Sequence, residues 1–427
     1  MDNYSPIIVE GNRTAFTKNF TEYEHINSID LSIPVVQNLI KKSGLSNIDQ
    51  LIFGQVIQNI KAPNIAREIV IGSSLSINTD AFSLTRACTT SLQAATCAIE
   101  SIRSGNAKTV IAGGVDSCSN IPIQINSQLG KIISKTATQK SIFKKIRSIL
   151  SIKKSNIGLE FPAVKEYFTD TSMGETAELM AKMYQITRKE QDEFANRSHN
   201  LATKAKQAKE LESQIINTYN YQKNEFTKID NLIRENSQIA NYNKLKPVFD
   251  RKYGSVTAAN SCALTDGAAA ILLAEKKYAK KNNLKELGSI KSYSHVAINV
   301  TEDMLMGPAY AITSALKKAK LSIQDIDLFE IHEAFSAQIL ANIKALNCNK
   351  FATEKLNQIE KIGELPIDKL NIQGGSIAYG HPFAATGARL ITQLCYQLKK
   401  RGGGIGLAAA CAAGGLGSAI IIKVDNV

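Results

Sequence analysis

The 427-residue sequence contains no run that approaches the roughly 18 consecutive apolar residues of a membrane span. Its first residues lack the charged-then-apolar pattern of a signal peptide, and their acidic side chains argue against a transit peptide. Hydrophobic residues make up 44% and charged residues 21%, as in an average globular protein. We therefore expect a soluble, cytoplasmic protein with two domains, or two domains and an insertion.

Paired cysteines are also missing. The seven cysteines form an odd set, none of them is spaced as CxxC, and no histidine lies at zinc-ligand spacing from any of them. This pattern excludes a disulfide framework and predicts that the protein has no metal site. Five of the cysteines are expected to be small buried apolar side chains: Cys97, Cys118, Cys262, Cys348 and Cys395. Cys88 and Cys411 have surroundings that need a separate explanation.

Acidic residues are absent from residues 124–159, a stretch that holds eight lysines and arginines out of a net charge of +13. Apolar residues recur there at helical steps of three and four: Ile142, Phe143, Ile146, Ile149 and Leu150. The pattern predicts a basic amphipathic helix, which suits a lipid surface or a protein partner but also occurs as an ordinary helix with a solvated lysine face. No nucleic-acid-binding motif accompanies the charge, so no nucleic-acid partner is expected.

Short apolar segments alternate with amphipathic ones along most of the chain. Strands are predicted at residues 51–55, 109–113, 269–274, 327–331 and 404–409. Helices are predicted over 89–103 and after Gly387, and this alternation indicates an α/β fold. Between Asn120 and about Pro247 the strand pattern fades, which predicts an insertion over a two-domain core. Both halves contain a strand, a small-residue turn with a reactive side chain and a helix, as expected from a structural duplication.

Cys88 lies at the end of an extended run, and Thr89 or Thr90 is positioned to cap the helix that follows. A thiol at a helix N-terminus meets unpaired N–H groups and the positive end of the helix dipole. Both favour the thiolate, which is the reactive form of cysteine. This context leaves two interpretations open, a catalytic nucleophile and a buried apolar side chain.

Two histidines and a second cysteine lie in comparable surroundings. His381 is clamped between glycine and proline before a helix, which suits a general base or an oxyanion donor. His332 directly follows the predicted strand 327–331, where α/β active sites gather, and Ser336 stands where a zinc-binding HExxH motif would need histidine. Cys411 lies in a run of tiny residues that lets backbone N–H groups approach a substrate, and a thiol there can act as acid and base at carbon.

These four blocks resemble the signature regions of the thiolase family. They read RACTTSLQ around Cys88, HEAF at 332–335, GHP at 380–382 and CAAGG at 411–415. Further similar segments cover much of the rest of the chain: 62–68, 172–177, 256–261, 264–269 and 371–383. HEAF is typical of the degradative branch, since many thiolases carry NEAF there. Two departures occur, Ala413 in place of the family's glycine and RTA in place of RTP at 13–15. Neither removes a reacting side chain.

The resemblance implies the thiolase fold, in which two similar βαβαβαββ core domains form a five-layer α-β-α-β-α arrangement with an inserted loop domain. Residues 1–120 together with 247–275 would form the N-terminal core domain. Residues 121–246 would form the inserted domain, facing CoA, a membrane or a partner. Residues 276–427 would form the C-terminal core domain.

The resemblance also implies CoA-dependent cleavage of a 3-ketoacyl-CoA to acetyl-CoA and an acyl-CoA two carbons shorter. Cys88 would be the nucleophile that carries the acyl group, His381 its base, and Cys411 the acid and base at carbon. His332 would hold a water that serves, with His381, the oxyanion of the thioester enolate. Ala413 would contribute its backbone N–H, with that of Cys88, to the oxyanion hole of the tetrahedral intermediate. CoA would be a cosubstrate, and no cofactor or metal would be needed.

The implied partners are a second copy, giving a homodimer core, and an α-subunit with hydratase and dehydrogenase activities. Segment 128–156 would contact that subunit or the surface of a membrane. The first alternative is a biosynthetic acetoacetyl-CoA thiolase, which differs in the shape of its acyl pocket. A ketoacyl synthase of the same fold pairs its cysteine with two histidines or with histidine and asparagine, so Cys411 argues against it. A non-catalytic relative would normally have lost Cys88 or His381.

Overall fold

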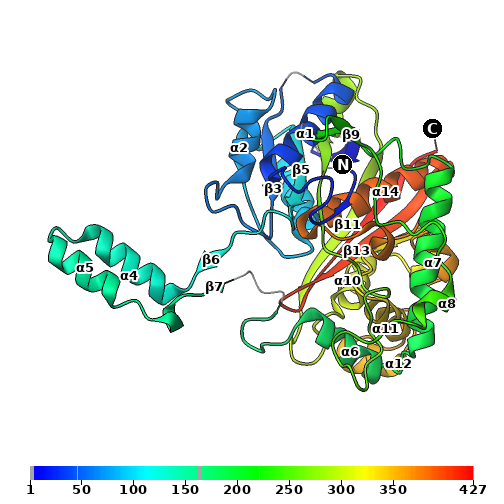
Figure 1. The fold of residues 1–427 in the computed structure, drawn as a ribbon. Coiled ribbons are helices and arrows are strands. Elements are labelled where there is room, and N and C mark those ends of the chain that lie inside the picture. The colour runs from blue at the N-terminus through cyan, green and yellow to red at the C-terminus, as the bar shows by residue number, and fades with distance from the viewer. Residues whose placement is uncertain (1–3, 46, 161–164, 221, 427) are drawn as a thin grey trace.

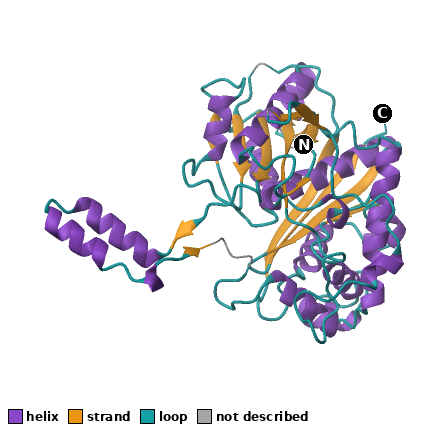
Figure 2. Cartoon of the chain, in the orientation of Figure 1, coloured by secondary structure: helices purple, strands orange, loops and turns teal. Residues whose placement is uncertain are grey.

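A mixed ten-stranded β-sheet runs through the body of the protein (Figures 1 and 2). The structure is a computed structural model that describes residues 4–45, 47–160, 165–220 and 222–426. The domains predicted above include ten residues outside these ranges: 1–3, 46, 161–164, 221 and 427. In spatial order the N-terminal half of the sheet contains β1 (Pro6–Arg13), β10 (Thr265–Glu275), β5 (Thr109–Asp116), β3 (Gln50–Gly54) and β4 (Asp80–Phe82), with β2 (Thr17–Lys18) beside β10. The C-terminal half contains β11 (Gly288–Ala297), β14 (Leu416–Val424), β13 (Gly404–Ala412) and β12 (Leu328–Ile331).

The two halves of the sheet repeat one topology. In the N-terminal half β10 runs antiparallel to both β1 and β5, and β5 runs parallel to β3. In the C-terminal half β14 runs antiparallel to both β11 and β13, and β13 runs parallel to β12. The halves meet where β1 pairs briefly with β11. The duplication expected from the sequence is therefore present in the strand order.

Helices cover the two sheet halves in alternating layers. α1 (Ser28–Ser43) and α2 (Ile65–Gly72) pack on the outer face of the N-terminal half. α3 (Thr90–Arg103) and α14 (Thr386–Lys400) lie between the halves and share one apolar core with strands of both. α10 (Gly307–Ala319) and α11 (Ser336–Leu346) cover the outer face of the C-terminal half. The result is the expected five-layer α-β-α-β-α arrangement.

The remaining helices complete the body of the protein. α6 (Met173–Met183) and α7 (Arg188–Gln207) pack against α11, and α7 also contacts the short α13 (Ser376–Tyr379). The smaller elements are α8 (Ile239–Tyr242), α9 (Lys276–Lys281), α12 (Asn349–Lys355), the β8–β9 hairpin (Thr218–Asn220 and Glu225–Thr227) and the 3₁₀ turn η4 (Phe383–Ala385).

A helical hairpin projects from the body on two thin arms (Figure 1). The arms are β6 (Gln124–Ile125) and β7 (Leu159–Glu160), and the hairpin consists of α4 (Ser127–Thr138) and α5 (Ile142–Leu150). α5 confirms the predicted amphipathic helix. Every residue of both helices is described, and none of them is buried. Elsewhere too, no helix within the described ranges has the length and apolar character needed to cross a membrane.

All five predicted strands form, although several are longer than the sequence indicated. β5 continues past Gly113 to Asp116, and β13 continues past Ala409 to Ala412. Small residues do not end β13 because its pairing with β14 continues to the hairpin turn. Cys411 therefore lies within the strand, opposite Gly417, whereas the sequence-based prediction ended this strand two residues earlier, at Ala409.

Candidate active site

Cys88 follows a tight turn at the entrance of α3. Ala87 adopts a left-handed backbone with φ of 45°, which is unusual for a residue with a side chain. The Thr90 hydroxyl accepts a hydrogen bond from the Arg86 N–H (2.8 Å) and donates one to the Ala87 carbonyl (2.7 Å). Thr89 makes no side-chain cap on α3, and its hydroxyl donates to the Arg86 carbonyl instead. The threonines thus fix the turn that presents Cys88, rather than capping the helix as predicted.

His381 is held in a turn before α14 by one hydrogen bond at its backbone and one at its side chain. Its backbone N–H donates to the Ala263 carbonyl (2.9 Å), and its Nδ1 lies 2.6 Å from the Thr386 hydroxyl. The preceding Gly380 has φ of 90°, a conformation that favours glycine. These contacts leave the His381 Nε2 buried and without a hydrogen-bond partner among the described residues.

Asp116, at the end of β5, connects the turn that contains His381 to the N-terminal half of the protein by hydrogen bonds. Its carboxylate accepts the N–H groups of Val56 and Ile57 from the loop after β3, and that of Ala384 (2.8 Å) from the His381 turn. Burial raises the pKa of Asp116 to about 7, and these three N–H groups oppose the shift. The turn also lies close to Gly114, where a Cβ atom would approach the Ala384 carbonyl oxygen to 2.3 Å.

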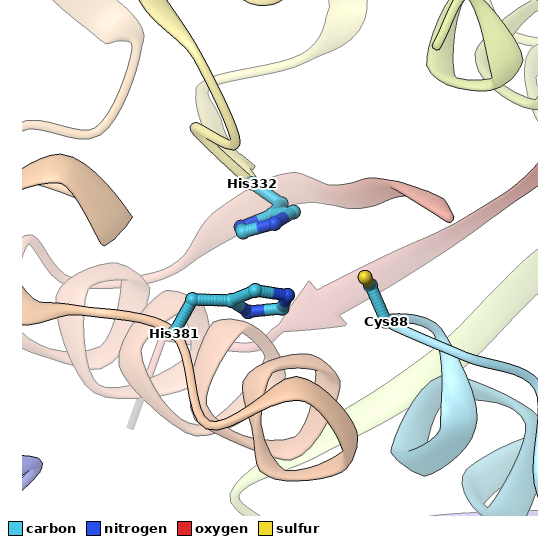
Figure 3. Close-up of side chains that lie close together, drawn as sticks. All are labelled: Cys88, His332 and His381. Carbon is cyan, nitrogen blue, oxygen red and sulfur yellow. The ribbon is translucent and has the colours of Figure 1, made fainter. Parts of the chain in front are cut away.

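His332 directly follows β12, as predicted, and stacks on His381. Its backbone N–H donates to the Ala409 carbonyl (2.9 Å) and its Nδ1 lies 2.8 Å from the Ser376 hydroxyl. The two imidazole centroids are 4.1 Å apart with an interplanar angle of 35°. Figure 3 shows both rings lying beside the Cys88 thiol. Three side chains from three separate parts of the chain therefore converge on one point.

The segment around Cys411 contributes the remaining residues of the site. Cys411 is buried on β13 and interacts electrostatically with Cys88 and with Cys262. The backbone N–H groups of Ala413 and of Cys88 itself lie near the Cys88 sulfur, where they lower the pKa of the thiol. The other four residues singled out in the sequence thus lie around the Cys88 thiol. Cys262, assigned there to the apolar interior, is only partly buried and lies at this site as well.

Among the described residues, Cys88, His332 and His381 are also the one group of three whose ligand atoms lie close enough to share a metal ion, within 4.8 Å of one another. Ligand atoms around tetrahedral zinc lie only about 3.5 Å apart, given Zn–N and Zn–S bonds of about 2.0 and 2.3 Å. A separation at the upper end of the 4.8 Å range leaves room for a reacting group between the side chains. The absence of a metal remains a prediction from the sequence.

Burial sets the protonation states of these groups. Desolvation raises the pKa of Cys88 to about 12, more than the two N–H groups at its sulfur lower it. Desolvation, reinforced by the charge of Arg389, lowers the pKa of His381 to about 3. Burial also holds the pKa of His332 well below, and that of Cys411 well above, the usual values. The resting site therefore contains neutral thiols and neutral imidazoles, and the thiolate expected from the helix dipole is not the resting form.

Sequence reasoning missed the groups that support these side chains. Arg389 lies fully buried on the side of α14 that also carries Gln393, to which it donates, and it donates to the Ser376 hydroxyl as well. An arginine directly before the apolar residues Leu390 and Ile391 of a buried helix is an observable anomaly, because arginine is almost never fully buried without a partner. No comparable feature distinguishes Asp116 or Ser376 in the sequence.

Comparison with known proteins is consistent with this geometry. The family profile described as "Thiolase, N-terminal domain" matches residues 6–277, and "Thiolase, C-terminal domain" matches residues 284–424. A 3-ketoacyl-CoA thiolase from Shewanella piezotolerans is 49% identical over 420 residues, which cover 98% of this chain and 96% of the relative.

Solved structures extend the comparison. The acetyl-CoA acetyltransferase of Bacillus anthracis superposes with a TM-score of 0.85 at 30% identity and covers 99% of both chains. Human mitochondrial 3-ketoacyl-CoA thiolase in complex with CoA superposes with a TM-score of 0.84 at 27% identity, covering 99% of this chain and 98% of the human one. The chain belongs to the thiolase family.

Proposed function

We propose that this thiolase cleaves 3-ketoacyl-CoA with CoA, releasing acetyl-CoA and an acyl-CoA shortened by two carbons. The observation that supports it most directly is the Cys88 thiol, which faces the unpartnered Nε2 of His381, has the second thiol of Cys411 nearby and receives two backbone N–H groups at its sulfur. A relative 49% identical bears the name 3-ketoacyl-CoA thiolase. CoA enters as a cosubstrate, and the proposed steps use no metal or prosthetic group.

In the first half-reaction His381 takes the Cys88 proton on Nε2 as the sulfur attacks the 3-keto carbon. The C2–C3 bond then breaks, and acetyl-CoA leaves as an enolate that takes the Cys411 proton. The acyl group stays on Cys88 as a thioester. The neutral resting pair is suited to this step, because a weakly acidic thiol becomes nucleophilic as its proton moves to the adjacent base.

In the second half-reaction the Cys411 thiolate accepts the proton of CoA. The CoA thiolate attacks the acyl-Cys88 thioester and releases the shortened acyl-CoA. The Cys88 sulfur leaves as a thiolate and recovers its proton from the His381 imidazolium. Cys88 thus regains its own proton through His381, whereas the proton that Cys411 gave to acetyl-CoA is replaced by the proton of CoA. Cys411 therefore acts first as an acid and then as a base.

Two oxyanions form along this path and need hydrogen-bond donors. The N–H groups of Cys88 and Ala413 meet at the sulfur, so they are placed to receive the oxygen of a tetrahedral centre formed there. His381 and His332, the latter with a bound water, would serve the thioester enolate. Removing one such donor typically lowers the rate by about 10²- to 10³-fold.

The domain division proposed for this function follows the sheet halves. Residues 1–120 with 247–275 hold β1–β5 and β10, and residues 276–427 hold β11–β14. Residues 121–246 hold the projecting hairpin together with α6 and α7. The active site would then lie between the core domains, with Cys88 supplied by the first and His332, His381 and Cys411 by the second. The homodimer core and the cytoplasmic location remain predictions.

The proposed activity is tested by following CoA-dependent loss of a long-chain 3-ketoacyl-CoA beside acetoacetyl-CoA. We expect turnover of the long substrate, with acetyl-CoA and the shortened acyl-CoA formed in equal amounts. Turnover of acetoacetyl-CoA alone would favour the biosynthetic alternative. Loss of neither substrate, with the chain alone and with the α-subunit added, would contradict a thiolase activity.

We further propose that the α4–α5 hairpin contacts an anionic lipid surface. The apolar side chains of α5 are exposed, with Phe143 82%, Leu150 79% and Ile142 68% accessible. They do not face α4, because it is Lys145 and Ser148 that are half-buried on the inner side of α5. Lysines surround this apolar face, and residues 124–159 contain no acidic side chain. A basic helix with an unpaired apolar face is typical of proteins that lie in the interface of a membrane.

Serine at positions 142, 143, 146, 149 and 150 should weaken binding to vesicles that contain phosphatidylglycerol by at least about 100-fold, because each buried aliphatic side chain contributes about 1.5 kcal/mol. Co-sedimentation measures the binding, and turnover of a soluble short-chain substrate should not change. Ile359→Ser, at a residue 98% exposed elsewhere, is the control. Equal sedimentation of the wild type and the five-serine variant would contradict the lipid assignment. Loss of α-subunit binding in that variant would assign the hairpin to the partner instead.

A further inference from the structure

A chain of buried polar side chains runs from Glu330 to His332 behind the active site. Arg389 lies 3.2 Å from Glu330 through Nη1 and 2.8 Å from the Ser376 hydroxyl through Nη2. The same hydroxyl lies 2.8 Å from the His332 Nδ1. All four side chains are fully buried, with no exposed surface. Arg389 and His332 are the two polar groups that the structure places within hydrogen-bond distance of this hydroxyl among the described residues.

The direction of the first hydrogen bond follows from the chemistry of arginine. A guanidinium carries five N–H donors and no acceptor, and it stays protonated in proteins. Ser376 must therefore accept from Arg389, and one of its two lone pairs is used. Its single hydroxyl proton remains available, and His332 Nδ1 is the one group in reach that can accept it.

The other tautomer of His332 would leave that hydroxyl proton without an acceptor. If Nδ1 carried the imidazole proton, both Arg389 and His332 would donate to the Ser376 oxygen. The hydroxyl proton would then be buried without an acceptor, which is unfavourable in a site closed to water. When Nδ1 accepts instead, the Ser376 hydroxyl both accepts and donates a hydrogen bond.

We propose that Arg389 and Ser376 are positioning residues that hold neutral His332 in the tautomer with its proton on Nε2. That nitrogen is buried and has no hydrogen-bond partner among the described side chains, and the His332 ring places a nitrogen within 4.8 Å of the ligand atoms of Cys88 and His381. Burial, together with the neighbouring His381 ring and the charge of Arg389, holds the pKa of His332 well below its usual value, so the ring stays neutral. The proton faces the site as a hydrogen-bond donor.

This assignment gives the two stacked histidines different roles. The proposed function, on which the inference rests for its catalytic meaning, needs a base at His381 and a donor at His332. A donor to an oxyanion or its bound water must carry a proton on the nitrogen that faces the site. His381 has no arginine behind its Nδ1, which contacts the Thr386 hydroxyl instead. Thr386 can accept a hydrogen bond, so His381 is free to keep Nε2 unprotonated as a base.

The tautomer can be observed without any substrate. We would label the five histidines of the full chain with ¹⁵N and identify the His332 signals as those that are missing in His332→Gln. An unprotonated ring nitrogen and a protonated one have widely separated chemical shifts. We expect an unprotonated Nδ1 and a protonated Nε2 throughout the neutral pH range. A protonated Nδ1 in the wild type would overturn the proposal, whatever the substrate of the enzyme.

Ser376→Ala then tests the relay. We expect the His332 signals to shift toward a mixture of tautomers and kcat to fall by about 10- to 100-fold with KM nearly unchanged, as for a weakened oxyanion donor. Ser376→Thr keeps the hydroxyl and should restore the wild-type tautomer. Ser32→Ala is the matched control, because Ser32 is equally buried and its hydroxyl donates to a backbone carbonyl within α1. It should leave both readouts unchanged.

Two outcomes of the mutant experiment contradict the proposal. One is a Ser376→Ala enzyme with wild-type His332 signals, and the other is a changed tautomer with kcat unaltered. If the alanine variant does not fold, the wild-type spectrum and Ser376→Thr still decide the assignment. Failure of the wild type to turn over any 3-ketoacyl-CoA would refute the proposed function and leave the tautomer measurement standing.

Discussion

Replacing Cys88 with alanine is expected to lower kcat by about 10⁶-fold, the scale of loss seen when a catalytic nucleophile is removed. The thiol forms the covalent bond to the acyl group in the proposed path, and no other group can substitute for it at the sulfur position that receives the Ala413 N–H. The His381 base would keep its place because its contacts are to Ala263 and Thr386. We therefore expect the Cys88→Ala variant to lose its thiolase activity and to keep its fold.

Two measurements check this result. Steady-state thiolysis gives kcat, and mass spectrometry of enzyme mixed with acyl-CoA reports the acyl adduct, which should map to the peptide that contains Cys88. Cys97→Ala is the matched control, because Cys97 lies on α3, the helix that begins just after Cys88, and is also partly buried. It should retain wild-type turnover and acylation. If the Cys88→Ala variant kept more than a tenth of wild-type activity, another residue would be the nucleophile.

The reacting side chains were predictable because each is a chemically distinctive residue in a distinctive local setting. Cys88, His332 and His381 all stand where a strand or turn enters a helix, and such junctions can be recognised within about ten residues of sequence. Their convergence was not predictable from spacing, since it depends on how the two sheet halves meet. It came instead from the resemblance to a family, which supplied the arrangement as a whole.

The supporting contacts were not predictable for the same reason. Ser376 and His332 lie 44 positions apart, and Asp116 and Ala384 lie 268 apart. The sequence around a serine or an aspartate does not indicate a hydrogen-bond partner at that separation. The thiolate expected at Cys88 was wrong because the helix dipole is visible in sequence, whereas the desolvation that raises its pKa depends on the packing around the folded site.

Cys411 presents a different problem, because its role is inferred from a thiol that does not bond to substrate. Burial and the nearby thiols Cys88 and Cys262 hold its pKa well above the usual value. A thiol so disposed is fully protonated at rest and can give its proton to an enolate. Once deprotonated in the same surroundings, it is a strong base toward the thiol of CoA. The raised pKa therefore serves both half-reactions.

We expect Cys411→Ala to slow the exchange of acetyl-CoA methyl protons with deuterated water by about 10³-fold, within the range for loss of a general acid or base. NMR or mass spectrometry of the recovered acetyl-CoA measures the exchange, which reports proton transfer at carbon apart from acyl transfer. Cys395→Ala is the matched control, since Cys395 is equally buried, on α14, and should cost similar stability with no loss of exchange. Exchange retained by Cys411→Ala but lost in His381→Ala would assign the carbon acid and base to His381. That result would leave Cys411 as a packing residue and require one imidazole to perform both proton transfers.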